Sequence, residues 1–204
     1  MSEFWELAFS NNDKMWGETP TDNSWTVLEL FQKNNIKDVL IPGFGYGRNA
    51  KVFYDNGYTV TGIEISKTAI KRARKYFKSE VTIHHGAVAD MPFDKDKFDA
   101  IYCYSLIHLL GKAERKQLIK DCYAQLSSRG IMIFVALSTR DKRFGIGEKI
   151  EQNTFQTPQG LNLYFYDKKS VKEEFKNYNL IDLQEINEPE ENPNEKHWMI
   201  ICKK

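Results

Sequence analysis

The sequence predicts an α/β protein built on a doubly wound seven-stranded sheet, mostly parallel with an antiparallel last strand. Two observations carry this prediction. Short apolar, β-branched runs alternate with segments of helical spacing, and such alternation is typical of parallel sheets with helices on both faces. The last two strand-like runs have no helical segment between them, so they must pair antiparallel or lie apart. The seven expected strands are Ile36–Pro42, Tyr58–Ile65, Val81–His84, Phe98–Tyr104, Ile131–Leu137, Leu180–Ile186 and His197–Cys202.

Four helices are expected between these strands, and local signals mark some of their ends. Residues Gly45–Asp55 have helical spacing and stop at Asn56-Gly57, a good helix terminator. Ser66 is a suitable N-cap for a helix that runs through Phe77. The other two expected helices are Lys112–Leu126 and Asp167–Tyr178.

The length of the chain favours one domain that spans residues 1–204. A chain of 204 residues lies within the size that a single hydrophobic core supports. Residues 1–35 precede the first expected strand and form an N-terminal cap segment. Residues 138–166 are rich in Gly, Gln, Asn and Thr. A segment of this length in a compact domain is functional, disordered or partly helical.

Composition and charge argue against several classes of protein. The 29 basic and 28 acidic residues give a formal net charge of +1, which removes the bulk electrostatic argument for nucleic-acid binding. The longest apolar run, Ile131–Leu137, is far shorter than the about 20 residues of a membrane span. No signal peptide is recognised at the N-terminus. Three cysteines without a CxxC pair argue against a structural zinc site and fit a cytoplasmic protein. We therefore expect no bound metal, no membrane association, and a monomer or homodimer.

The turn after the first expected strand is the most informative segment. Gly43, Gly45 and Gly47 alternate along it, and glycines permit positive φ and a close approach of a ligand to the backbone. The helix that follows offers free N–H groups. Glu64 ends the next strand, 17 residues after Gly47. Neighbouring strands end at the same edge of a doubly wound sheet, so Glu64 is placed to accept the hydroxyl protons of a ribose. The alternative is that Glu64 caps the following helix.

The shape of this loop separates the candidate families. Dinucleotide-binding enzymes use GxGxxG, whereas this chain has GxGxG followed by Arg48-Asn49. This form resembles motif I of the class I S-adenosylmethionine (AdoMet) methyltransferases, which have a Rossmann-like sheet with an antiparallel seventh strand. The resemblance extends, in the same order and spacing, over most of the chain. Its further segments are Gly86–Phe93, Lys97–Ile101, Leu106–Leu110 and Leu126–Ile133.

The resemblance implies AdoMet as cofactor and a set of residues that hold it. The glycine loop would cradle the methionine portion and the ribose, and the backbone of Val88 would meet the adenine. Ala87 stands where the family often carries an acid, so Asp90 either substitutes for it or caps its own loop. The implied cofactor-binding residues are Trp16, Gly43, Gly45, Gly47, Glu64, Ile65, Val88, Asp90, Tyr104 and Ser105.

The N-terminus and motif I are similar to one group within that family. Motif I commonly has an acid where this chain has Pro42. Proline at this position resembles the thiopurine, thiol/halide and tellurite-resistance methyltransferases, and so does the Trp-rich N-terminus with Trp5 and Trp16. In those enzymes this segment lies over the cofactor. The alternative is that these rings pack a helix onto the sheet.

The expected reaction is in-line methyl transfer from the AdoMet sulfonium to a small-molecule acceptor. His108, just beyond the fourth expected strand, is the candidate catalytic base, with a structural role as the alternative. A soft anionic acceptor would need positioning only. Residues 138–166 are expected to form a lid over the acceptor. Two other functions stay open: a nicotinamide-dependent oxidoreductase, and a non-catalytic module that binds AdoMet or a partner.

Overall fold

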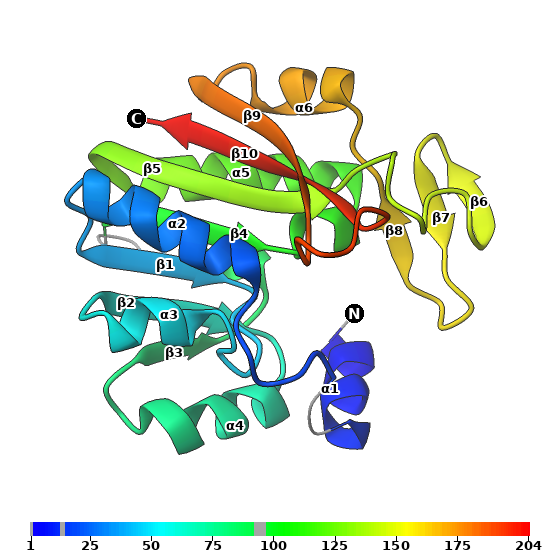
Figure 1. Cartoon of the computed structure of the whole chain (residues 1–204). Coiled ribbons are helices and arrows are strands. Elements are labelled where there is room, and N and C mark those ends of the chain that lie inside the picture. The colour runs from blue at the N-terminus through cyan, green and yellow to red at the C-terminus, as the bar shows by residue number, and fades with distance from the viewer. Residues whose placement is uncertain (1, 13–14, 92–96) are drawn as a thin grey trace.

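The fold is known from a computed structural model that describes residues 2–12, 15–91 and 97–204 (Figure 1). Its centre is a seven-stranded sheet with the strand order β3-β2-β1-β4-β5-β10-β9. The pairs from β3 to β5 are parallel, and β10 runs antiparallel to both of its neighbours. This confirms the predicted fold class and the antiparallel pairing of the last two strands. The strands are β1 Asp38–Pro42, β2 Thr59–Glu64, β3 Thr82–His85, β4 Phe98–Tyr104, β5 Leu126–Leu137, β9 Leu180–Asn187 and β10 Lys196–Lys203.

Helices cover both faces of this sheet, as the strand–helix alternation predicts. One core cluster lies between the sheet and residues of α2, α3 and α4, and the other lies between the sheet and residues of α5 and α6. Along β4, Ala100 and Tyr102 belong to the first cluster, whereas Ile101 and Cys103 belong to the second. The helices are α1 Ser2–Asn11, α2 Asp22–Lys33, α3 Ala50–Asp55, α4 Lys67–Phe77, α5 Lys112–Gln125 and α6 Lys168–Phe175, with the 3₁₀ helices η1 Val88–Asp90 and η2 Ile107–Leu109.

Some helix ends lie where the sequence places them, and others do not: α6, for example, ends at Phe175 rather than Tyr178. The Ser66 side chain accepts a hydrogen bond from the N–H of Ala69 at 3.1 Å, which confirms Ser66 as an N-cap. Helix α3 ends at Asp55. Its start was expected at Gly45 but lies at Ala50. The preceding loop has three glycines at φ of +57° to +82°, and such residues cannot continue a right-handed helix.

Two other segments differ from the expectation. Strand β5 begins at Leu126 rather than Ile131, with an irregular register against β4 and a positive φ at Arg129 in between. Residues 138–166 contain a second, antiparallel sheet that the sequence did not predict. Each of its strands has only three or four residues, too few for a clear alternation of polar and apolar side chains. These strands are β6 Glu148–Glu151, β7 Thr154–Gln156 and β8 Asn162–Tyr164.

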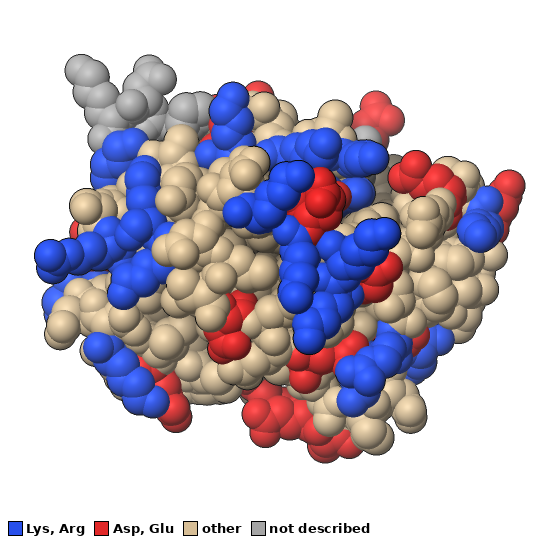
Figure 2. All heavy atoms as spheres, turned by 90° about the horizontal axis from the view of Figure 1, so that it is seen from above, with Lys and Arg blue, Asp and Glu red and all other residues tan. Residues whose placement is uncertain are grey.

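The arrangement leaves two small elements beside the carboxyl ends of the parallel strands. Helix α1 and the β6–β8 sheet both lie on the right in Figure 1, where those strands end. Basic and acidic side chains are interspersed on the face shown in Figure 2, in keeping with the formal net charge of +1. Within the described ranges, no helix has the length and apolar character needed to cross a membrane.

Candidate active site

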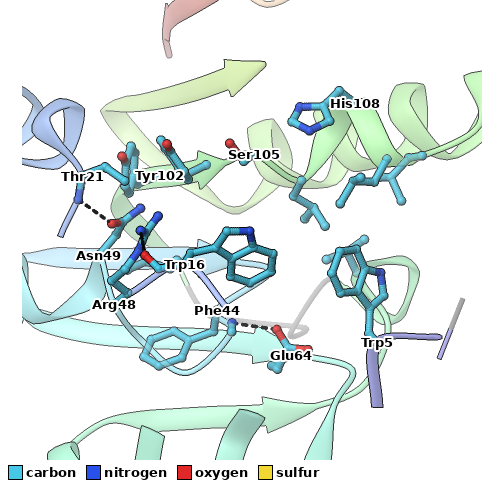
Figure 3. Close-up of a pocket in the computed structure, with 18 of the residues that line it drawn as sticks. Trp5, Trp16, Thr21, Phe44, Arg48, Asn49, Glu64, Tyr102, Ser105 and His108 are labelled. Atoms are coloured by element: carbon cyan, nitrogen blue, oxygen red, sulfur yellow. Dashed lines mark hydrogen bonds between the residues drawn. The ribbon is translucent and has the colours of Figure 1, made fainter. Parts of the chain in front are cut away.

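A cavity of about 1160 Å³ opens at the carboxyl ends of β1, β2 and β4. Its walls come from the N-terminal segment, the glycine loop, η1, η2, the start of α5, residues before and in β8, and the loop between β9 and β10. Figure 3 shows part of this lining, with Glu64 and His108 on different sides of the space. Of the expected site residues, the cavity brings together Trp16, Gly43, Gly45, Glu64, Ile65, Val88, Tyr104, Ser105 and His108.

Glu64 is held in place by the backbone on both sides of it. Its Oε2 accepts a hydrogen bond from the N–H of Gly45 at 2.7 Å, and its Oε1 accepts one from the N–H of Ser66 at 2.8 Å. Glu64 therefore also bonds the start of the next helix, which was the alternative reading. Burial raises the pKa of this carboxyl, while the two N–H groups act in the opposite direction. A carboxylate has about four acceptor sites. The two that remain can accept hydroxyl protons from a ligand.

The three glycines of the loop have different surroundings. Gly43 and Gly45 line the cavity. A Cβ added to Gly45 would meet only a ring atom of Phe9, at 3.9 Å. A Cβ added to Gly47 would lie 2.3 Å from Cε2 of Phe77, on α4. Gly47, expected to contact the cofactor, is absent from the cavity lining and instead permits the close approach of α4.

The first part of the N-terminal segment, helix α1 and Trp16, lies against the glycine loop, whereas α2 packs on the sheet. The indole of Trp16 stacks on Tyr46, with ring centroids 6.4 Å apart and planes at 16°. Trp5 and Phe9 of α1 contact the same indole at centroid distances of 6.1 and 5.7 Å. The Arg48 guanidinium donates to the carbonyl of Trp16. All four rings line the cavity, and Figure 3 shows Trp5 and Trp16 at its edge, where they are positioned to cover a ligand.

Apolar side chains near η1 and η2 form part of the cavity wall, here called the apolar slot. They are Ile65, Val88, Leu109 and Leu110. The N–H of Val88 is the first of its short helix, so it has no acceptor inside that helix. The exposed Asp90 is not part of the cavity lining, and its Oδ2 accepts the N–H of Ala87 at 2.8 Å. The structure thus places Asp90 in the loop-capping arrangement. The end of this expected loop, Pro92 and Phe93, lies outside the described residues.

The end of β4 is conformationally unusual. Ser105 follows Tyr104 with φ of +52°, a value that costs a non-glycine residue about 1–2 kcal/mol. The N–H of Ser105 donates to the carbonyl of Val135 at 2.9 Å, which ties this turn to β5. Such strain is concentrated at functional sites, and here it turns the chain along the cavity wall.

His108 lies beyond that turn and is 6% exposed. Its Nδ1 accepts the backbone N–H of Leu137 at 3.3 Å. Burial lowers its pKa well below the usual 6.5, and the nearby His197 and Arg143 act in the same direction. The ring is therefore neutral near pH 7 and carries its proton on Nε2, as a donor. Its role as a base stays a prediction, and this hydrogen bond favours the structural alternative.

Sequence reasoning missed the acidic residues of the cavity other than Glu64, and Glu188 is the one among them that is buried. Glu188 belongs to the loop between β9 and β10 and lines the cavity, although it is only 4% exposed. Nothing in the charged stretch Asn187–Lys196 distinguishes it from solvated acids. Within residues 2–12, 15–91 and 97–204, no group of three or more His, Cys, Asp or Glu side chains could hold a metal ion.

Comparison with known proteins agrees with this geometry. Residues 40–134 match the family model described as a methyltransferase domain. The matched part runs from β1 into β5 and includes the glycine loop, Glu64 and His108.

Curated relatives resemble part of this chain. A putative methyltransferase of Geobacillus sp. (strain WCH70) is 28% identical over 142 residues, which are 62% of this chain and 55% of that protein. The chain spans only 15 to 55% of the length of the curated relatives it matches.

Solved methyltransferase structures are similar to this chain over nearly its whole length. The CcbJ methyltransferase from Streptomyces caelestis is 16% identical, with a TM-score of 0.76 over 98% of this chain and 97% of that one. The 1,6-didemethyltoxoflavin-N1-methyltransferase of Burkholderia thailandensis, solved with S-adenosylhomocysteine and its acceptor, is 14% identical. Its TM-score is 0.72 over 90% of this chain and 77% of that one. At these identities the likeness establishes the class I methyltransferase fold.

Proposed function

We propose that this protein binds AdoMet and transfers its methyl group to a small-molecule acceptor. The observation that carries the proposal is the placement of Glu64. Its fixed carboxylate ends β2 beside the two cavity-lining glycines, with acceptor sites left for a ribose. The methyltransferase family match covers both features.

The residues of the cavity fit this cofactor along its whole length. Glu64 would accept the ribose hydroxyls, and the apolar slot beside Val88 would take the adenine. Gly43 and Gly45 leave the loop open toward the remaining, methionine part. Trp16 would cover the cofactor from the side opposite the sheet, which supports the likeness to the thiopurine and thiol/halide group at this point.

AdoMet supplies an activated methyl group, because a sulfonium is a good leaving group. The chain has to align the acceptor and exclude water. His108, His197 and Arg143 line the same cavity and would border the acceptor. His197 has a pKa lowered to about 4, chiefly by burial, so both imidazoles are neutral at pH 7. Imidazoles with such lowered pKa values accept protons weakly, which favours positioning of the acceptor over base catalysis in this corner, and the base role of His108 stays a prediction.

Residues 138–166 would form one wall of the acceptor site. Arg143, Leu161 and Leu163 of this segment line the cavity. Phe144, Phe155 and Phe165 pack against one another, with centroids 5.2 to 6.1 Å apart, and stiffen the segment. A guanidinium beside aliphatic side chains suits a small acceptor with a polar group, in keeping with the small molecules that the neighbours' descriptions name.

The nicotinamide-dependent alternative fits the cavity less well. A dinucleotide pyrophosphate needs an open helix N-terminus behind the glycine loop. Here Asn49, the residue before α3, is already engaged, because its Oδ1 accepts the N–H of Thr21 at 3.0 Å. Gly47 packs under Phe77. The residue before α3 is therefore bonded to the N-terminal segment, and the third glycine of the loop faces α4 rather than the cavity.

Calorimetric titration of the purified protein with AdoMet, S-adenosylhomocysteine and NAD tests the proposal. We expect binding of the first two and none of NAD. Binding of NAD alone would refute it. Methyl release with a panel of thiols, halides, metalloids and small phenols then separates an enzyme from a non-catalytic binding module, since only an enzyme turns AdoMet over.

A further inference from the structure

Glu188 is a buried acid in the cavity, and the reaction as described so far does not use it. Its Oε2 accepts the N–H of Asn23, in the first turn of α2, at 3.0 Å. This bond fixes the side chain while the residue still lines the cavity. In the part of the chain that the structure describes, no Lys, Arg or His forms an ion pair with Glu188.

Arg48 complements this acid across the same cavity. It lines the cavity from the glycine loop, and its positive charge acts on the Glu188 carboxyl without forming an ion pair. One of its nitrogens, Nη1, donates to the carbonyl of Trp16. A guanidinium has five N–H donors, so most remain for a ligand.

A buried charge without a counter-ion is costly, and a ligand of opposite charge offsets that cost. A separated carboxylate and guanidinium in one cavity match a molecule that carries an ammonium and a carboxylate close together. An α-amino acid is such a molecule. The methionine end of AdoMet has this form, and the cavity already contains Glu64 for its ribose.

We propose that Glu188 and Arg48 together bind the zwitterionic end of the cofactor, with Glu188 facing the ammonium and Arg48 the carboxylate. This inference rests on the proposed function and adds a contact from the β9–β10 loop to the cofactor site. The Glu188 carboxylate then has two roles, because it bonds the loop to α2 and also contacts the cofactor.

The surroundings of Glu188 make this contact dependent on pH. Burial, together with the charge of Asp22 on α2, raises its pKa to about 7, while Arg48 on the glycine loop lowers it. Tyr102 and Tyr104 of β4 also face it, and burial raises the pKa of both hydroxyls, so they are neutral. Glu188 is thus ionised only above about pH 7, and an ammonium group binds more tightly as the pH rises through that value.

The test compares two ligands that differ only in the amino-acid end. S-Adenosylhomocysteine carries it, and 5′-methylthioadenosine lacks it but keeps the ribose and the adenine. Both are titrated by calorimetry into the wild type, Glu188→Gln, Arg48→Met and Glu190→Gln. Glu190 is an exposed acid of the same loop that does not line the cavity, so it serves as the matched control. The glutamine at 188 keeps an oxygen for the Asn23 N–H, and a thermal melt checks that it folds.

We expect Glu188→Gln to weaken S-adenosylhomocysteine by about 10- to 100-fold at pH 8, the effect of one charge-assisted hydrogen bond. Arg48→Met weakens it in the same way. Methylthioadenosine affinity stays within about twofold in both, and Glu190→Gln leaves the affinity for both ligands unchanged. Between pH 6 and 8 the wild type gains up to about tenfold in affinity for S-adenosylhomocysteine, and Glu188→Gln gains none.

Equal losses for both ligands would overturn the inference, because they would show a general disturbance of the cavity. Unchanged S-adenosylhomocysteine affinity in Glu188→Gln would also overturn it. That second result would leave the proposed function intact as long as the wild type binds. A wild type that binds neither ligand would remove the proposed function and the inference together.

Discussion

Replacing Gly45 and Gly47 one at a time by alanine separates ligand binding from packing within a single loop. Both residues have positive φ, +57° and +82°, so an alanine at either position costs about 1–2 kcal/mol from the backbone alone. At Gly45 the added methyl has nothing closer than 3.9 Å and points into the cavity region. At Gly47 it lies 2.3 Å from Cε2 of Phe77 and 2.9 Å from Cε1 of Phe44.

That overlap adds an overpacking cost at Gly47. Inserting a methyl group into a filled core costs about 1–3 kcal/mol, because buried rings have to move. Phe44 and Phe77 are both buried and contact each other, with centroids 5.7 Å apart, so neither can turn aside easily. We expect a loss in the free energy of unfolding of about 2–5 kcal/mol for Gly47→Ala and about 1–2 kcal/mol for Gly45→Ala.

Urea denaturation and calorimetry with S-adenosylhomocysteine measure the two effects. Gly45→Ala should lose affinity, because Gly45 lines the cavity and the added methyl group would take space from the cofactor. Gly47→Ala, measured at a temperature where it is folded, should keep its affinity within about threefold, since Gly47 borders Phe44 and Phe77 and does not line the cavity. The assignment of Gly45 to ligand binding and Gly47 to packing would be refuted if both variants lost the same stability. It would also be refuted if a folded Gly47→Ala lost its affinity.

Three further predictions test the site and the stability of the fold around it. Glu64→Ala should weaken S-adenosylhomocysteine by about 2–3 kcal/mol, because charge-assisted hydrogen bonds to the ribose are lost; calorimetry that finds no change would contradict the ribose assignment. The His108 ring should be neutral and protonated on Nε2 from pH 6 to 8 in ¹⁵N NMR spectra, since burial lowers its pKa; a titration near pH 6.5 would contradict this and favour its predicted role as a base. Arg115→Met should cost about 3–5 kcal/mol in urea denaturation, because it leaves Glu174, its partner at 2.9 Å, buried without a counter-ion. The exposed pair of Lys176 is the control, and Lys176→Met should cost less than about 1 kcal/mol.

The order of the main elements could be predicted because each one carries apolar side chains at strand or helix spacing over a long stretch of sequence. Strand β4 alternates its side chains between two cores, and Ser66 caps α4 by a local bond that its residue type already suggests. Glu64 could be placed at the site for a similar reason. In a parallel sheet, the end of the strand after a glycine loop lies next to that loop.

The parts that were missed depend on contacts between distant segments. The alternate glycines of motif I do not reveal that Phe77, thirty residues later, fills the space beside Gly47. The β6–β8 strands form because Phe144, Phe155 and Phe165 meet, and no window of the sequence contains that cluster as a pattern. Glu188 is buried only because its loop folds onto α2.

The four tryptophans give the molecule a built-in optical readout. Trp5 and Trp16 line the cavity, and both indoles are visible at its edge in Figure 3. Trp25 is half exposed on α2, away from the cavity lining, and Trp198 is nearly buried in β10 with its N–H on the carbonyl of Tyr166. Quenching on addition of a ligand would therefore come from the first pair. In a Trp5→Phe, Trp16→Phe variant, the remaining fluorescence would follow unfolding with little response to ligand, so one spectrometer could record occupancy and folding as separate signals.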